Sequence, residues 1–301
     1  MLLLNMLPSF RTHIRTSSSG LTGGSDSRFR GNDRVLAGLF LMALLLLAGC
    51  ARARVVRARE GETPRGAAGP VSIAPPLATI PVGERLDYDV LWWGVLVGRA
   101  RLETNLTPDG KRVELNFLAD SNWYLRALYP VHVHLNSMVD PQTVSPRRFD
   151  SYLKRQWRVH ESVISFEPTQ GVSVHHLPGD RVITVPVGPT TQDGLSMLYY
   201  ARTMPLALGK TVPLEITADG KNWPLNATVT QAGIIHIGSA GYWPAVEGEV
   251  ELAYPVPFFH GAKARVWFSA DQDRIPLLAK IRSRIGPVTV VLSRRSFDSK
   301  S

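Results

Sequence analysis

Five histidines on candidate strands are the residues of this chain that could bind a metal. His132 and His134 are two positions apart, so on a strand both side chains lie on one face. His160, His175 and His176 lie on neighbouring candidate strands, and three or four such imidazoles could bind zinc. No carboxylate stands at ligand-like spacing beside the His-x-His pair, and a polar strand face produces the same pattern. We therefore keep His132 and His134 only as weak metal candidates and expect no cofactor.

Two other patterns suggest catalysis or metal binding, but each has a simpler explanation. Residues 271–273 (Asp-Gln-Asp) resemble the opening of a calcium loop, yet the chain lacks the glycine and distal glutamate that complete one, which favours a turn. Ser196 lies near Asp193, but no Gly-x-Ser-x-Gly elbow surrounds it and the spacing is that of a helix cap. We expect no catalytic residue.

The tryptophans are the more suggestive feature. There are seven of them: Trp92, Trp93, Trp123, Trp157, Trp223, Trp243 and Trp267. Adjacent strand residues point to opposite faces, so one of Trp92 and Trp93 should line the interior unless a bulge intervenes. Core packing accounts for most of the seven, and the alternative is an aromatic-walled cavity of the kind large barrels enclose. We take Trp92, Trp93 and Trp267 as candidate ligand-binding residues.

The only cysteine, Cys50, ends an apolar stretch that runs from Val35 to Gly49. The segment Leu47-Ala48-Gly49-Cys50 resembles the signal of a bacterial lipoprotein, in which Cys50 would carry the lipid. The stretch is shorter than the roughly 20 residues that span a bilayer and matches a signal-peptide core of about 7–15 residues. A signal anchor or a buried helix is the alternative, and it is favoured by the arginines that follow Cys50, because they oppose translocation. The residue after Cys50 is not aspartate, which resembles lipoproteins of the outer membrane.

Charge and composition divide the chain into three parts. Residues 1–49 are a predicted signal region, of which 1–33 are interpreted as an over-extended start. Residues 50–81 are a predicted flexible tether that is rich in Arg, Pro and Gly. The net charge of +9 divides equally among residues 1–50, 51–65 and 66–301. The body of the protein is therefore nearly neutral, which argues against nucleic-acid binding, and the basic tether suits an anionic membrane surface.

Residues 82–297 are predicted to form a single domain of antiparallel strands. Short alternating runs separated by turn residues, such as Leu86 to Trp92 and Val113 to Phe117, indicate strands. The pattern contains ten or more strands and one short helix, which begins at an Asp193 cap and ends before Pro205. So many strands favour an all-β fold with a large curved sheet or an incomplete barrel, since one flat sheet would expose long edges.

Three segments carry a family resemblance. They are residues 86–100 (LDYDVLWWGVLVGRA), residues 193–202 (DGLSMLYYAR) and residues 266–289, which include VWFSAD and GPVT. Together they resemble the bacterial domain-of-unknown-function family 3108 over nearly the whole predicted domain. The resemblance implies a mostly antiparallel β protein exported to the periplasm, and it brings no catalytic residues.

These observations predict a non-enzymatic lipoprotein on the periplasmic face of the outer membrane. Our leading hypothesis is a monomeric binding module for a lipid or another amphipathic envelope molecule. The alternative is an assembly or scaffolding lipoprotein that binds an envelope protein. A metal-dependent hydrolase that uses the histidine strands is the third hypothesis.

Overall fold

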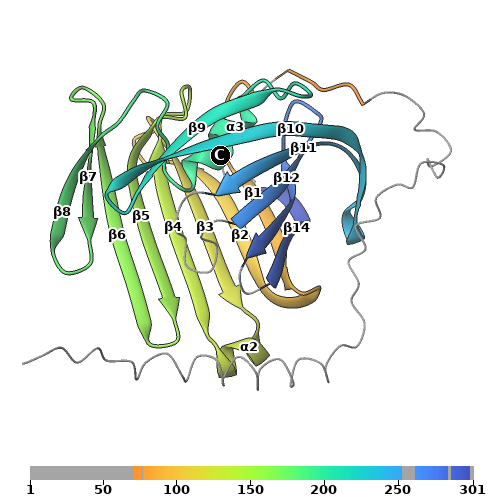
Figure 1. Ribbon diagram of the computed structural model, residues 1–301, viewed down its shortest axis with the longest axis horizontal. Helices are drawn as coiled ribbons and strands as arrows, with labels where there is room; N and C mark the ends of the chain where they lie inside the picture. Colours follow the sequence, from red (N-terminus) through yellow and green to blue (C-terminus); the bar gives the residue numbers. More distant parts are fainter. Residues whose placement is uncertain (1–70, 76, 253–261, 284–285, 299–301) are drawn as a thin grey trace, which may run out of the picture. The chain divides into compact units, whose positions relative to one another are not determined.

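The computed structural model describes residues 71–75, 77–252, 262–283 and 286–298 (Figure 1). The predicted signal region, residues 1–49, and Cys50 at the start of the predicted tether lie outside these residues. No helix in the described part of the chain has both the length and the apolar character needed to cross a membrane.

One antiparallel sheet of fourteen strands accounts for most of the described residues. The strands are β1 Glu84–Trp92, β2 Val95–Leu106, β3 Val113–Ser121, β4 Val131–Val139, β5 Pro146–Arg155, β6 Arg158–Glu167, β7 Val172–Leu177, β8 Arg181–Pro186, β9 Thr211–Ala218, β10 Lys221–Ile237, β11 Gly241–Leu252, β12 Ala262–Ser269, β13 Pro276–Ser283 and β14 Gly286–Phe297. The first strand, β1, pairs with the last, β14, so β8 and β9 become the two edges. The predicted all-β curved sheet, an incomplete barrel, is confirmed.

The described residues contain two α-helices rather than the single helix we expected. Helix α3 (Ser196–Arg202) is the predicted one, and α2 (Trp123–Leu128) is additional. Helix α2 is too short to show a helical repeat in the sequence. It is held at its start by Asn122, whose backbone N–H donates to Val97 O and whose side-chain amide donates to Leu96 O.

The N-cap residue of α3 is Leu195 rather than the predicted Asp193, but Asp193, two positions earlier, makes hydrogen bonds to the start of the helix. Its Oδ1 accepts the backbone N–H groups of Leu195 and Ser196, each at 2.8 Å, while its own N–H donates to Ser196 Oγ. This reciprocal pair is a capping box. Ser137 on β4 donates to the other carboxylate oxygen at 2.6 Å, so the cap also ties α3 to the sheet. Burial raises the pKa of the Asp193 carboxyl, although these hydrogen bonds act in the opposite direction.

The expectation that Trp93 lies within a strand is wrong. Strand β1 ends at Trp92, and Trp93 and Gly94 form a two-residue turn with φ of 51° and 81°. Positive φ at both positions is what the tightest antiparallel hairpins require, because such turns follow the twist of the strands. Trp93 is therefore 61% exposed, whereas Trp92 stays in the sheet and is half-buried.

The predicted tether becomes part of the packed domain by residue 71. Val71 and Ile73 pack against the buried side chains of Val229 and Val246, and Ile80 is itself buried. The backbone of Ala74 donates to Ala270 O, which adds a hydrogen bond to this packing. Apolar residues between the prolines thus occupy partly buried or, for Ile80, buried positions that the composition of the segment did not indicate.

The tip of the β10–β11 hairpin packs against the outer face of β12, β13 and β14, which is the face of the sheet opposite to α3. We predicted two strands over residues 223–238, but they form the single long strand β10, which continues past a bulge between Val229 and Gln231. Ile237, from this tip, belongs to one buried cluster with Trp267 and Leu278 on the covered strands. Both faces of the sheet are therefore buried in this region.

The gap between the edge strands is bridged by a buried histidine. His175 on β7 is fully buried, and its Nδ1 accepts the N–H of Gly220 in the β9–β10 turn at 3.2 Å. Its Nε2 lies 3.1 Å from Thr217 Oγ1 on β9 and 2.9 Å from Ser173 Oγ. Asn222 on β10 also donates to Pro186 O at the end of β8.

The hydrogen bond between His175 and Gly220 fixes the tautomer of the imidazole, and the packing around Gly220 restricts the residue type at position 220. Because Nδ1 accepts a backbone N–H, the neutral imidazole carries its proton on Nε2, and burial lowers the pKa of the ring despite the opposing charge of Asp219. Gly220 has a φ of +76°, and a Cβ there would lie 2.8 Å from Ile183 Cδ1 on β8. The close approach of the two edges therefore requires glycine.

We predict that acid weakens the fold through His175. Its pKa is lower in the folded than in the unfolded chain, so its contribution to stability is complete above about pH 6.5 and is lost as the pH falls below that value. In thermal unfolding between about pH 7 and about pH 5, the His175→Gln variant should lose less of its melting temperature than the wild type. The control is His176→Gln at the exposed neighbouring position, which should keep the wild-type profile. Equal profiles for wild type and His175→Gln would contradict the prediction.

Candidate functional site

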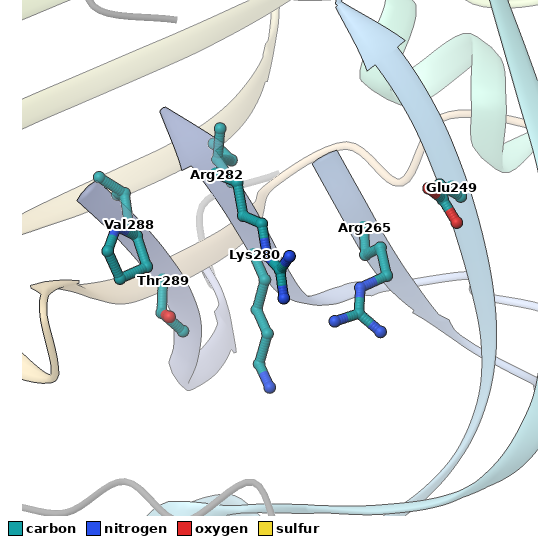
Figure 2. Close-up of a pocket in the computed structure, with 8 residues that line it drawn as sticks. Glu249, Arg265, Lys280, Arg282, Val288 and Thr289 are labelled. Carbon is teal, nitrogen blue, oxygen red and sulfur yellow. The ribbon is translucent and has the colours of Figure 1, made fainter. Parts of the chain in front are cut away.

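A pocket of 520 Å³ lies on the outer face of strands β11 to β14 (Figure 2). Register places Glu249, Arg265, Lys280 and Thr289 side by side across these four strands. Arg282 also lines the pocket, so three cations face one carboxylate. A surplus of guanidinium and ammonium groups in a concave surface suits an anionic group such as a carboxylate or a phosphate.

Trp267 lies beside this pocket, on the same face of the sheet as Arg265 and Lys280, and does not line it. Its side chain is buried in the cluster covered by the β10–β11 tip, with Arg265 Cζ and Lys280 Nζ 5.7 and 5.6 Å from the ring centre. At these distances the cations interact with the face of the indole. Arg265 also pairs with Glu247 at 3.3 Å, so its guanidinium is held between the indole and a carboxylate.

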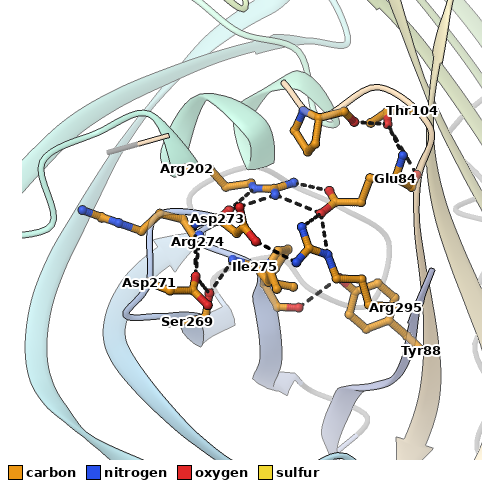
Figure 3. Close-up of polar contacts among 12 residues, drawn as sticks. Glu84, Tyr88, Thr104, Arg202, Ser269, Asp271, Asp273, Arg274, Ile275 and Arg295 are labelled. Atoms are coloured by element: carbon orange, nitrogen blue, oxygen red, sulfur yellow. Dashed lines mark hydrogen bonds and ion pairs between the residues drawn. The ribbon is translucent and has the colours of Figure 1, made fainter. Parts of the chain in front are cut away.

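A second polar cluster lies on the opposite, inner face, where it fastens α3 inside the curved sheet (Figure 3). Arg202 at the end of α3 donates to both carboxylate oxygens of Glu84 on β1, at 2.6 and 3.2 Å. Both side chains are fully buried. Although burial opposes its charge, the hydrogen bond and the charge of Glu84 raise the pKa of Arg202.

Two further groups complete this ion-pair cluster, which consists of Glu84, Arg202, Asp273 and Arg295. Arg202 also donates to the backbone oxygen of Asp273, and Arg295 on β14 bridges Glu84 at 2.8 Å and the Asp273 carboxylate at 2.7 Å. The cluster joins β1, β14, α3 and the β12–β13 turn.

The burial of the side chains on the inner face differs between the two ends of the strands. On the α3 side, Leu86, Leu102 and Leu115 are at most 1% exposed, because Leu195 and Tyr199 of the helix belong to the same cluster. We call the opposite side, at the β1–β2 turn, the open end. There five apolar inner-face residues are only partly buried, although Gly98 and Ser121 beside them are buried: Val90, Phe117, Ala119, Leu135 and Val290. Solvent therefore reaches an apolar surface inside the sheet.

The structure separates the three candidate tryptophans. Trp92 shares the inner face with Val90 and lies at the open end, opposite Val288 of β14. Trp93 is in the adjoining turn, and Trp267 is on the outer face of the sheet. The apolar inner surface and the cationic pocket are thus on different faces and do not form one site.

The histidines are also distributed over both faces. His132 and His134 lie on the outer face of β4, and His132 Nδ1 is 2.7 Å from Asp120 Oδ1. His175 is buried on the inner face, and His160 Nε2 is 3.8 Å from Asp219 Oδ1. Within the residues that the structure covers, no three His, Cys, Asp or Glu side chains come close enough to share a metal ion.

The Asp-Gln-Asp segment forms the predicted turn. Asp271 Oδ1 accepts hydrogen bonds from the backbone N–H groups of Asp273 and Arg274 and from the hydroxyl of Ser269. This carboxylate oxygen is therefore used in hydrogen bonds within the turn. Arg274, with a φ of 48°, donates from the turn to Ala74 O and Met204 O. The turn thereby anchors the segment that enters the domain.

Sequence reasoning did not single out the charged residues of either cluster. Arg265 and Lys280 alternate with apolar neighbours on consecutive strands, a signal that identifies one polar face but not a pocket. Glu84 and Arg202 are 118 positions apart, so no local pattern connects them. Of the seven tryptophans, Trp123 and Trp157 are the most exposed, at 82% and 78%.

We predict that Glu84→Ala lowers the free energy of unfolding by about 3–5 kcal/mol, because the Arg202 guanidinium stays buried but loses the carboxylate that pairs with it. The matched control is Asp150→Ala, which removes the partner of Arg148 in an exposed pair and should cost at most about 1 kcal/mol. Urea unfolding measures both. A loss for Glu84→Ala no larger than that of the control would refute the role given to the ion-pair cluster.

Comparison with known proteins adds a family but no activity. Residues 87–293 match the family described as "Protein of unknown function (DUF3108)". No curated protein matches the chain.

One solved structure that resembles the fold is the crystal structure of a beta-barrel-like protein of domain of unknown function DUF1849 from Brucella abortus. It shares 11% sequence identity and a TM-score of 0.48, over 72% of this chain and 98% of that one. The family match alone covers more than half of the sequence, and the chain therefore belongs to the DUF3108 family.

Proposed function

We propose that this protein is a non-enzymatic binding module that holds the apolar part of a lipid or another amphipathic envelope molecule against its inner face. The observation that carries the proposal is the half-buried apolar surface at the open end. Val90, Phe117, Ala119 and Leu135 point into the curved sheet, yet they are not covered as Leu86 and its neighbours are.

The energetics of this surface favour an acyl chain or a similar apolar group. Each methylene removed from water contributes about 0.8 kcal/mol, so a few methylenes laid along these side chains would give useful affinity. Trp92, on the same face, adds a broad ring that can pack against such a chain. The ion-pair cluster keeps α3 at the other end, so the helix does not fill this surface.

A substitution that fills the open end tests this proposal. Ala119→Trp should lower the affinity for a fluorescent fatty acid, dansyl-undecanoic acid, at least about tenfold, since the new ring would occupy the space of roughly two or more methylenes. The matched control is Leu118→Trp, whose side chain lies on the outer face of the same strand and should leave binding unchanged. Binding by the wild type that Ala119→Trp does not weaken would place the ligand elsewhere, and no binding by the wild type would remove the proposal.

We further propose that the chain is a lipoprotein anchored through Cys50 on the periplasmic face of the outer membrane. The support is the Leu47-Ala48-Gly49-Cys50 segment, which ends an apolar stretch of signal-peptide length. Acyl chains on Cys50 would make the attachment long-lived, since two or more chains are needed for stable anchoring.

Labelling with radioactive palmitate in bacteria that express the full chain tests this anchor. The wild type should incorporate label and sediment with outer membranes, because its acyl chains partition into the bilayer. Cys50→Ala should incorporate none and leave the outer-membrane fraction. A wild-type chain without label, or a Cys50→Ala chain with label, would contradict the lipoprotein assignment.

A further inference from the structure

Three exposed tryptophans lie in three connections between strands, all at the same end of the strands. We call this row of connections the edge, which is distinct from the edge strands β8 and β9. Trp93 is in the β1–β2 turn, Trp123 begins α2 between β3 and β4, and Trp157 is in the β5–β6 turn. Because the strands are antiparallel and paired in chain order, all three connections belong to the open end. Figure 1 shows α2 and the β5–β6 turn along the lower edge of the sheet.

The exposure of these side chains is unusual for tryptophan. They are 61%, 82% and 78% exposed, whereas the other four tryptophans of the chain are half-buried or buried. Leaving so much indole surface in water is unfavourable, and large exposed apolar groups gathered at one edge mark an interaction surface.

The spacing of the three rings suits a broad, flat partner. Neighbouring strands are about 4.8 Å apart, so successive connections lie about 10 Å apart and the row from Trp93 to Trp157 extends about 20 Å. A compact hot spot on a protein partner would instead gather its aromatic anchors in one desolvated centre. Tryptophan is also the residue that most favours the headgroup level of a bilayer, where its ring is apolar and its N–H remains wet.

The charges beside the row favour an anionic surface. Arg126 is in the last turn of α2, and Arg155 and Arg158 flank the β5–β6 turn. Arg126 and Arg158 are exposed, and residues 122–130 and 155–158 contain no aspartate or glutamate. Basic side chains at this level attract the headgroups of anionic phospholipids.

From these observations we infer that Trp93, Trp123 and Trp157 form a membrane-contact edge that inserts into the headgroup region of an anionic phospholipid bilayer. The inference rests on the edge itself and holds whether or not the inner face binds a ligand. In this orientation the open end faces the bilayer, and an acyl chain could pass between the membrane and the inner face without crossing bulk water.

Quenching of tryptophan fluorescence by brominated phospholipids tests the contact directly. The full chain is reconstituted on vesicles of phosphatidylethanolamine and phosphatidylglycerol whose acyl chains carry bromine near the headgroup. Bromine quenches only indoles that touch the lipid, so an anchor elsewhere in the chain does not produce the signal. We expect strong quenching of the wild type and loss of most of it in the Trp93→Phe, Trp123→Phe, Trp157→Phe triple variant.

A second triple variant is the matched control. Trp223→Phe, Trp243→Phe and Trp267→Phe remove the same number of indoles from positions away from this edge and should leave the quenched emission in place. Replacing phosphatidylglycerol by phosphatidylcholine, or combining Arg126→Gln with Arg158→Gln, should reduce quenching of the wild-type tryptophans. Circular dichroism confirms that each variant is folded.

Two results would overturn the inference. One is a wild type whose emission the brominated lipids leave unchanged, the result expected if the edge binds a protein instead. The other is quenching that the edge variant retains in full. Neither result bears on the inner face, because the fatty-acid titration of Ala119→Trp is read without vesicles.

Discussion

The buried ion pair between Glu84 and Arg202 is the constraint on which the interior of this protein depends. Removing a carboxylate and a guanidinium from water is costly, and the two-point hydrogen bond with its Asp273 and Arg295 partners offsets that cost only in one geometry. The pair therefore gives α3 a single position, at one end of the curved sheet. A helix held only by apolar contacts could take several positions along an apolar sheet, whereas the ion pair holds α3 in one.

The position of α3 divides the interior in two. Beside the helix the inner face is a close-packed core, and beyond it the same strands carry apolar residues that solvent reaches. The outer face is arranged differently, because the β10–β11 tip buries Trp267 and leaves a cationic pocket beside it. One continuous sheet thus has a packed core, an accessible apolar surface and a charged pocket. The pocket lies on the opposite face from the other two, and on the inner face α3 covers the core but not the accessible surface.

Local patterns in the sequence were sufficient for the fold class and insufficient for the sites. Alternation along runs such as Leu86 to Trp92 predicts strands, and the Asp193 cap predicts α3, because both depend on neighbouring residues. The turn at Trp93 was missed because a bulky side chain with positive φ is rare, and α2 was missed because six residues show no repeat. The Arg202 and Arg265 contacts join residues far apart in the chain, where no periodicity carries information.

The pairing of β1 with β14 has a consequence for how this chain folds. Glu84 and Phe297, at opposite ends of the domain, are direct partners in the ladder, and every pair between these strands is comparably distant in sequence. Closing such a loop costs chain entropy before any contact offsets it, and proteins dominated by distant pairings fold slowly. During synthesis one side of β1 has no partner until the last strand is complete. Before β14 is synthesised, β1 can pair only with its neighbour β2, so the pairing that joins the two halves of the sheet has to wait for β14.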